Sequence, residues 1–500
     1  MAGDFPVDDR TPGIRGGRGT KAITLDKLEF GTEETLQAEY RKTRKERRAL
    51  PETVTSKELY RDITRIAWPS LCELFLTSLV SMVDTMMVGG LGHGAISAVS
   101  LATQPKFLFM NLVMALNTGA TAVISRARGM QDKERADSIM RQNMVFITVI
   151  ALFSTIVGYY LSSPLIRFMA NGGLDDEVLS QSVTYLRIQF LFFPALSWTA
   201  GITAALKGTG DAKPSMYYNT AANMVNIVFN WLLINGRLGF PRLEVAGASI
   251  ATGIGQCVAL VIALCCAFSG RFYCKLRLRH LLHFDADIIR GIVKVGVPSL
   301  LEQLIMRFGM VLFTRTVASL GSIEFATHNI CMNIQGLSFM VGQGFAVSST
   351  ALVGQSLGKK RPDIAEHYSR RCRNLGLVVS LVLALLFVVL RTPLVWLYNK
   401  DAEILRLGSY IMLFVAVLQP FQANQFILGG SLRGAGDTRF TAAVMLVTVV
   451  IIRTSMAWIL VDWLGLGLTG AWIAVGIDQI LRSFIIMARH DRCKWKKITL

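Results

Sequence analysis

The chain has 500 residues, of which 52% are hydrophobic and only 17% charged, and its mean hydropathy is +0.45. A soluble domain typically carries about 25% charged residues. The composition therefore excludes an ordinary soluble enzyme, a disordered protein and a disulfide scaffold, and it predicts a polytopic α-helical membrane protein. The eight cysteines form no Cys-x-x-Cys pair, and free thiols in apolar runs behave as small hydrophobes, so we expect no redox or metal site.

The first 60 residues contain no continuous apolar run, so we expect no cleavable signal peptide. We predict a mostly disordered, solvated tail over 1–60. A basic cluster at 41–48 precedes the first apolar stretch, where it could contact anionic lipid headgroups.

Twelve apolar stretches follow the tail, each long enough to cross about 30 Å of hydrocarbon. They lie at roughly 62–88, 94–125, 139–163, 178–206, 215–236, 244–269, 290–318, 323–352, 372–392, 403–432, 438–461 and 468–488. Their short connections leave no room for a second soluble domain. We predict an N-terminal six-helix bundle at 61–270, a linker at 271–289, a C-terminal six-helix bundle at 290–488 and a short tail at 489–500.

The basic residues are unevenly divided between alternate loops. With a cytoplasmic N-terminus, the inner loops and the C-terminal tail hold 25 Lys and Arg residues, and the outer loops hold seven. The positive-inside rule then places both termini in the cytoplasm. This distribution explains the net charge of +18 without a nucleic-acid partner.

The two halves of the chain repeat each other. Residues 69–73 (PSLCE) return at 298–302 (PSLLE), and 206–211 (LKGTGD) return at 432–437 (LRGAGD). Six stretches separate equivalent points, so the halves share one orientation, as in a parallel repeat about an axis along the membrane normal. In the repeated Gly-Asp turns, Asp211 and Asp437 are expected to cap the helices that follow.

Four of the prolines inside the apolar stretches are expected to interrupt them, because proline removes a helical hydrogen bond. A kink at such a position is either fixed shape or a hinge, and the sequence leaves both open. The candidate hinges are Pro69, Pro194, Pro298 and Pro420.

Ionisable residues inside the membrane are costly and usually functional. Asp478 and Arg482 are spaced i, i+4, so a local ion pair accounts for them. Asp84 has no opposite charge one turn away. Its carboxylate must therefore be protonated, hold a cation or face water, and we predict a functional role. The six histidines form no cluster, so we expect no metal site and no enzyme.

Several motifs, taken in order, resemble one family. They are 83–92 (VDTMMVGGLG), 206–214 (LKGTGDAKP), 223–227 (NMVNI), 239–241 (GFP), 245–252 (VAGASIAT) and 432–438 (LRGAGDT). Together they resemble the multidrug and toxin extrusion (MATE) transporters of bacteria over roughly 60–490. The resemblance implies two six-helix bundles forming a V that switches between outward-open and inward-open states.

By position, the resemblance implies a cation-coupling site at Asp84, Asn226, Asn230 and Thr252. Many members have an acid where this chain has Asn230, so a single carboxylate favours H⁺ exchange or a weak Na⁺ site at Asp84. In the second half the resemblance implies a polar site at Glu302, Gln419, Gln422 and Gln425. That stretch contains no carboxylate on the tenth helix, which puts a Na⁺ site there in doubt.

The implied function is antiport: small organic compounds, often cationic, leave across the plasma (bacterial inner) membrane in exchange for H⁺ or Na⁺. No other cofactor is implied, and we expect a monomer whose partners are its substrates and the lipid bilayer. One alternative is a lipid-linked oligosaccharide flippase of the same superfamily, favoured by Lys106, Arg307 and Arg453. Another is a non-transporting membrane scaffold or receptor, which would need neither the repeat nor Asp84.

Overall fold

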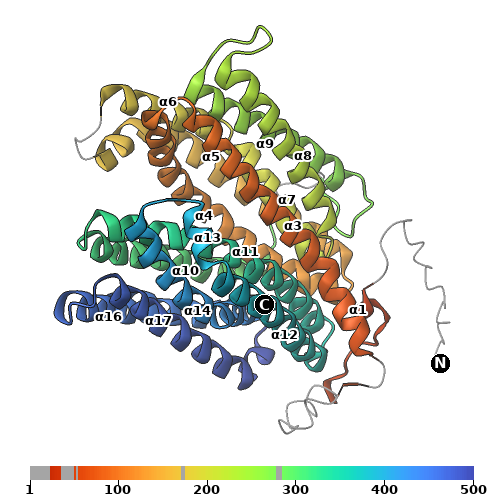
Figure 1. Ribbon diagram of the computed structural model, residues 1–500. Coiled ribbons are helices and arrows are strands. Elements are labelled where there is room, and N and C mark those ends of the chain that lie inside the picture. Colours follow the sequence, from red (N-terminus) through yellow and green to blue (C-terminus); the bar gives the residue numbers. More distant parts are fainter. Residues whose placement is uncertain (1–22, 35–49, 52–53, 171–174, 278–283, 500) are drawn as a thin grey trace, which may run out of the picture.

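The computed structural model describes residues 23–34, 50–51, 54–170, 175–277 and 284–499, and these segments contain helices, turns and loops but no strand. Two helical bundles, one coloured orange to green and one blue-green to blue, converge at the right of Figure 1 and diverge to the left. The all-α fold with twelve membrane-spanning helices in two six-helix bundles is confirmed.

The first bundle runs from α3 to α9, and its fourth span is divided into two helices, α6 and α7. Its elements are α3 (Ser56–Gly89), α4 (His93–Gly129), α5 (Lys133–Ala170), α6 (Asp176–Leu191), α7 (Phe193–Thr209), α8 (Lys213–Asn235) and α9 (Glu244–Phe268).

The second bundle runs from α10 to α17, and its fifth span contains two π-helical segments, η2 and η3. Its elements are α10 (Ala286–Ala318), α11 (Ser322–Gly358), α12 (Pro362–Val389), α13 (Arg391–Trp396), α14 (Ala402–Ala435), α15 (Thr438–Met445), η2 (Leu446–Arg453), α16 (Thr454–Trp458), η3 (Ile459–Trp463) and α17 (Gly467–Asp491). A short 3₁₀ helix, η4 (Lys494–Lys497), ends the chain.

Length and apolarity identify most of these spans directly. Ten described helices are long and apolar enough to cross a membrane, and α6 with α7 forms an eleventh span bent by 49°. The twelfth span is α8, whose 23 residues include Asn219, Asn223, Asn226 and Asn230. These amides lower its hydropathy, and two of them, Asn226 and Asn230, are predicted coupling residues.

The prolines behave differently from the expectation that each interrupts its span. Pro69, Pro298 and Pro420 lie inside the continuous helices α3, α10 and α14. Only Pro194 follows a break, because it occupies the first turn of α7 immediately after the bend at Phe192. The prediction of interrupted helices is therefore wrong at three of the four sites, and a hinge role for any of them stays a prediction.

The repeated Gly-Asp turns end helices rather than begin them. Gly210 and Gly436 terminate α7 and α14 with φ of 89° and 84°, a left-handed conformation that glycine adopts without strain. Neither Asp211 nor Asp437 caps the next helix: the N-cap of α8 is Ala212, and Asp437 makes no side-chain cap bond. The Asp437 carboxylate instead accepts a 2.8 Å bond from Arg489 Nε, so the expected caps are wrong.

The second helices of the two bundles, α4 and α11, cross near their C-terminal ends. A Cβ on Gly129 would clash with the carbonyl oxygen of Gln355, and a Cβ on Gly358 would clash with that of Arg126. The two contacts are related by the same 229-residue shift as the sequence repeat. Backbone therefore meets backbone at a pseudo-twofold crossing, which we call the α4–α11 crossing.

The bundles also exchange contacts along their first helices. α10 packs on α4, where Gly119 approaches the backbone of Ile292 and Gly296 approaches that of Ala115. α3 packs on α11 in the corresponding way, with Leu71 lying against Gly344. Each bundle's first helix therefore rests on the other bundle's second helix, and the two halves are interlocked.

Part of the N-terminal tail covers the end of the molecule next to this crossing. The backbone N–H of Thr24 donates to Asp62 Oδ2 (3.0 Å), and Lys359 Nζ donates to the carbonyl oxygen of Leu25 (2.6 Å). Asp62 belongs to the first bundle and Lys359 follows α11 of the second, so this segment bridges both halves. Residues 1–22, 35–49 and 52–53 of the predicted disordered tail, including the basic cluster at 41–48, lie outside the described residues, and residues 56–60 belong to α3.

Substitution of Gly129 tests the α4–α11 crossing. Gly129→Ala places a methyl group against the Gln355 carbonyl, and such overpacking costs about 1–3 kcal/mol. We expect a lower midpoint of thermal unfolding for the purified protein in detergent. Gly336→Ala in α11 is the matched control, because a Cβ there meets nothing within 4 Å. Equal midpoints for the two variants would contradict the assigned contact.

Candidate functional site

A cavity of about 590 Å³ lies within the first bundle. Its walls come from α3, α4, α6, α7, α8 and α9. The four residues predicted to couple transport to a cation, Asp84, Asn226, Asn230 and Thr252, all line this cavity. The structure thus brings together side chains from α3, α8 and α9 that are far apart in the sequence.

Two buried asparagines bind the carboxylate of Asp84. Asn230 Nδ2 donates to Asp84 Oδ1 at 2.5 Å. With its nitrogen turned toward Asp84, the Asn226 amide donates to the same oxygen at 2.8 Å, and its own oxygen accepts from Thr252 Oγ1 at 3.2 Å. The asparagines are spaced i, i+4, which places both on one face of α8.

Among the residues that the structure describes, no cation pairs with Asp84, and its hydrogen-bond partners are amides. Lys106, on the same cavity wall, instead donates from Nζ to Gln189 Oε1 at 2.6 Å. A half-buried carboxylate with only neutral donors carries an uncompensated negative charge, which is unfavourable away from water. The site can gain stability by taking up a proton, Na⁺ or an organic cation.

The sequence analysis missed the polar partners of this cavity on α6. Gln189 accepts a hydrogen bond from Lys106 and donates one to Ser249 Oγ at 3.0 Å. Tyr185, one turn earlier on α6, lines the cavity. The i, i+4 spacing of two polar residues in an apolar span could have indicated an inward face.

Glu73 and Glu302 occupy equivalent positions and have equivalent partners. Glu73 accepts from Lys207 Nζ (3.0 Å) and Ser215 Oγ (2.8 Å). Glu302 accepts from Arg433 (3.0 Å) and Thr441 Oγ1 (3.0 Å). Each glutamate joins the first span of its bundle to the end of the fourth span and the start of the fifth.

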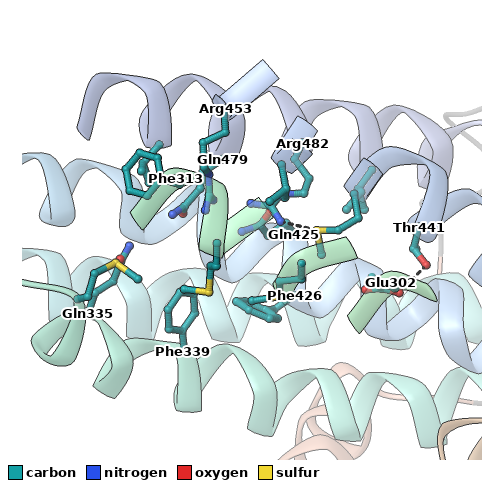
Figure 2. Close-up of a pocket in the computed structure, with 18 of the residues that line it drawn as sticks. Glu302, Phe313, Gln335, Phe339, Gln425, Phe426, Thr441, Arg453, Gln479 and Arg482 are labelled. Atoms are coloured by element: carbon teal, nitrogen blue, oxygen red, sulfur yellow. Dashed lines mark hydrogen bonds between the residues drawn. The ribbon is translucent and has the colours of Figure 1, made fainter. Parts of the chain in front are cut away.

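The four residues of the predicted second-half polar site do not form one site. Glu302 and Gln425 line a smaller cavity, of about 80 Å³, in the second bundle, and Figure 2 shows both among its walls. Gln419 Nε2 donates to the carbonyl oxygen of Val415 (3.0 Å), and Gln422 accepts from Gln335 Nε2 (3.1 Å). Neither of these two buried side chains lines the cavity, although Gln335, the partner of Gln422, does.

The described residues contain no group of three or more His, Cys, Asp or Glu side chains arranged to hold a metal ion. The candidate ligand set for Na⁺ is accordingly Asp84 with the amide and hydroxyl oxygens beside it. Oxygen ligands of this kind suit a hard cation.

Two parallel-repeat bundles with a polar cavity inside the membrane define the class of secondary transporters. The MatE family model matches residues 69–232 and 298–459, once in each bundle. The chain belongs to the MatE (MATE) family of membrane transporters.

Relatives and solved structures agree with this assignment. The chain is 27% identical over 440 residues to a probable multidrug resistance protein NorM of Thermotoga maritima, covering 88% of this chain and 94% of that protein. It is 26% identical over 434 residues to the uncharacterized transporter YisQ of Bacillus subtilis, covering 86% and 94%. A multidrug resistance MATE family transporter solved in an outward-facing conformation has the same fold, with a TM-score of 0.82, 21% identity, and 88% and 97% of the two chains covered.

A MOP superfamily transporter from Pyrococcus furiosus, described as having a binding pocket of reverse polarity, has a similar fold. Its TM-score is 0.82 at 21% identity, with 88% of this chain and 97% of that chain covered. Both solved structures support the fold.

The repeated glutamates yield a prediction about the second bundle. Glu302→Gln removes the negative partner of Arg433, and we expect a lower transport rate in everted vesicles because the α10 contact to α14 and α15 loses its charge pairing. Glu73→Gln should have a similar effect in the first bundle. Glu244→Gln is the control, because its pair with Arg242 is exposed. Normal transport by Glu302→Gln alongside loss in Glu73→Gln would confine the functional acids to the first bundle.

Proposed function

We propose that this transporter exports small organic compounds, often cationic, across the plasma (bacterial inner) membrane in exchange for H⁺ or Na⁺ by alternating access. The observation that carries the proposal is Asp84, a carboxylate that faces a cavity of about 590 Å³ and that, among the described residues, is bound by neutral amides alone. The multidrug resistance names of relatives such as the Thermotoga maritima protein support organic substrates.

Exchange follows from competition for one negative charge. A proton or Na⁺ on Asp84 and a cationic substrate in the same cavity each neutralise the carboxylate, so binding of one weakens binding of the other. Such negative coupling is reciprocal, which is the thermodynamic requirement for antiport. The ion drives the cycle only if it binds the two conformations with different affinity.

The interlocked helices supply a mechanical element for alternating access. The α4–α11 crossing fixes the bundles at one end, while Figure 1 shows them diverging toward the other. Rigid-body movement of one bundle against the other about such a contact is a common form of switching. Opening the closed end requires the backbone contacts at Gly129 and Gly358 to change.

Asp84→Asn tests the coupling role. The amide is uncharged and similar in shape, so we expect a folded protein that no longer transports against a pH or Na⁺ gradient in everted vesicles. Any remaining substrate binding should not respond to pH or Na⁺. Asp462→Asn is the matched control, because Asp462 is exposed at the end of the fifth span of the second bundle. Gradient-driven accumulation by Asp84→Asn would remove Asp84 as the coupling residue and make Glu302 the next candidate.

The proposed direction of export also requires a defined topology. With both termini cytoplasmic, reporter fusions after residues 170, 240 and 400 should report the outer side. Fusions after residues 130, 275 and 365 should report the cytoplasm. A reversal across a whole half would contradict the orientation that the basic residues predict.

A further inference from the structure

The smaller cavity in the second bundle contains a buried cluster of three charges. Arg453 and Arg482 line the cavity and are 8% and 6% exposed, and Asp478, between them on α17, is fully buried. In Figure 2 the two arginines and Gln479 lie in the upper part of the view, with Glu302 and Thr441 to the right. None of these arginines has a role in the proposed cation coupling.

The cluster holds two positive charges and one negative charge. Arg453 Nε (2.9 Å) and Arg482 (2.9 Å) both donate to Asp478 Oδ2, and a second nitrogen of Arg453 donates to the same oxygen. The other acid on the cavity wall, Glu302, is already bound by Arg433 and Thr441. One guanidinium charge is thus unbalanced, and a buried unpaired charge is strongly unfavourable.

The cavity also offers donors without partners. Arg482 Nε is buried and makes no hydrogen bond within the described part of the chain. The side-chain oxygens of Gln425 and Gln479 in the same cavity also lack a hydrogen-bond partner among the described residues, and rotation of either amide turns its N–H groups toward the cavity. The excess positive charge and the unused Arg482 N–H together match the chemistry of an anion.

The repeat places apolar residues of the second bundle at the positions of two predicted coupling residues of the first. In the repeat, Phe313 is equivalent to Asp84 at a shift of 229 residues, and Val475 is equivalent to Thr252 at a shift of 223 residues. The carboxylate site is therefore lost in this half. Arg453 ends the π-helical segment η2, and π-helical segments in α-helices are frequent at functional sites.

We propose that this cavity binds a small monovalent anion: the carboxylate of a transported organic molecule, or a free chloride ion. Its volume of about 80 Å³ is several times the roughly 10–15 Å³ that one water needs. It therefore admits chloride or a carboxylate group. Gluconate is disfavoured, because its hydroxylated chain would lose water against the Met and Phe side chains of the wall. A substrate carboxylate would make the exported compound zwitterionic or anionic; that part of the inference rests on the proposed function, whereas the anion site does not.

Binding is measured on the full-length protein in detergent without any ion gradient. The midpoint of thermal unfolding is followed while gluconate is replaced by formate or by chloride at constant ionic strength. We expect a saturable rise of several degrees, because a ligand that binds only the folded state stabilises it. A response to formate alone identifies a carboxylate site, a response to chloride alone identifies a halide site, and mutual competition identifies one site for both.

Arg453→Gln tests the charge argument, because it leaves Asp478 and Arg482 as a neutral pair. The anion response should disappear in Arg453→Gln and return in Arg453→Lys. Arg482→Gln is a second route to the same neutral pair should Arg453→Gln not fold. Arg315→Gln, on the exposed side of α10, should respond like the unmodified protein. No saturable response, or the same response in Arg453→Gln and Arg482→Gln, would overturn the anion site.

A transport measurement then separates the two sources of the anion. Everted vesicles are given a fluorescent amine that carries a carboxylate, or its methyl ester. If the site holds a substrate carboxylate, Arg453→Gln should lower export of the acid at least tenfold and leave the ester unchanged; equal losses for both would contradict this. Asp84→Asn should keep the anion response in unfolding experiments, so a failure of the proposed coupling and a failure of the anion site give different results.

Discussion

The arrangement of the molecule depends on the backbone contact between α4 and α11. Gly129 lies against the carbonyl of Gln355 and Gly358 against that of Arg126, at equivalent points of the two halves. Interiors are packed densely enough that even one added methyl group must displace a neighbour, and here the neighbour is backbone. The contact brings the halves close enough for α10 to pack on α4 and α3 on α11, so each cavity wall is held by helices that the other bundle supports.

The two halves share the ion pairs that join their helices but differ in the side chains that line their cavities. Glu73 with Lys207 and Glu302 with Arg433 make the same connection in the two bundles, at 3.0 Å each. Inside the bundles, Asp84 has been replaced at the equivalent position by Phe313. A common frame thus carries two cavities of different size, one lined by Asp84 and Lys106 and the other by Arg453 and Arg482.

Local sequence features predicted the parts of the structure that depend on local physics. Apolar length located all twelve spans, but polar ends of helices were missed: α12 begins at Pro362, ten residues before the predicted 372. The order of the motifs predicted that Asp84, Asn226, Asn230 and Thr252 come together. Contacts between distant segments were harder to predict. The i, i+4 spacing predicted the pairing of Arg482 with Asp478, but not that of Arg453, which lies 25 residues from Asp478. The glutamines of α14 could not be assigned to a common site, because a helix 34 residues long presents successive polar residues to different neighbours.

The separation of opposite charges into two cavities has an electrostatic consequence. Asp84 and the Arg453–Arg482 pair lie in different bundles, so neither neutralises the other by direct contact, and buried charges are poorly screened by salt. Each charge must be met by an ion, a proton or part of a ligand. A cation in the first bundle and an anionic group in the second would each lower the free energy of its own cavity. Movement of the bundles about the α4–α11 crossing would alter access to both cavities together, because the same backbone contacts hold their walls.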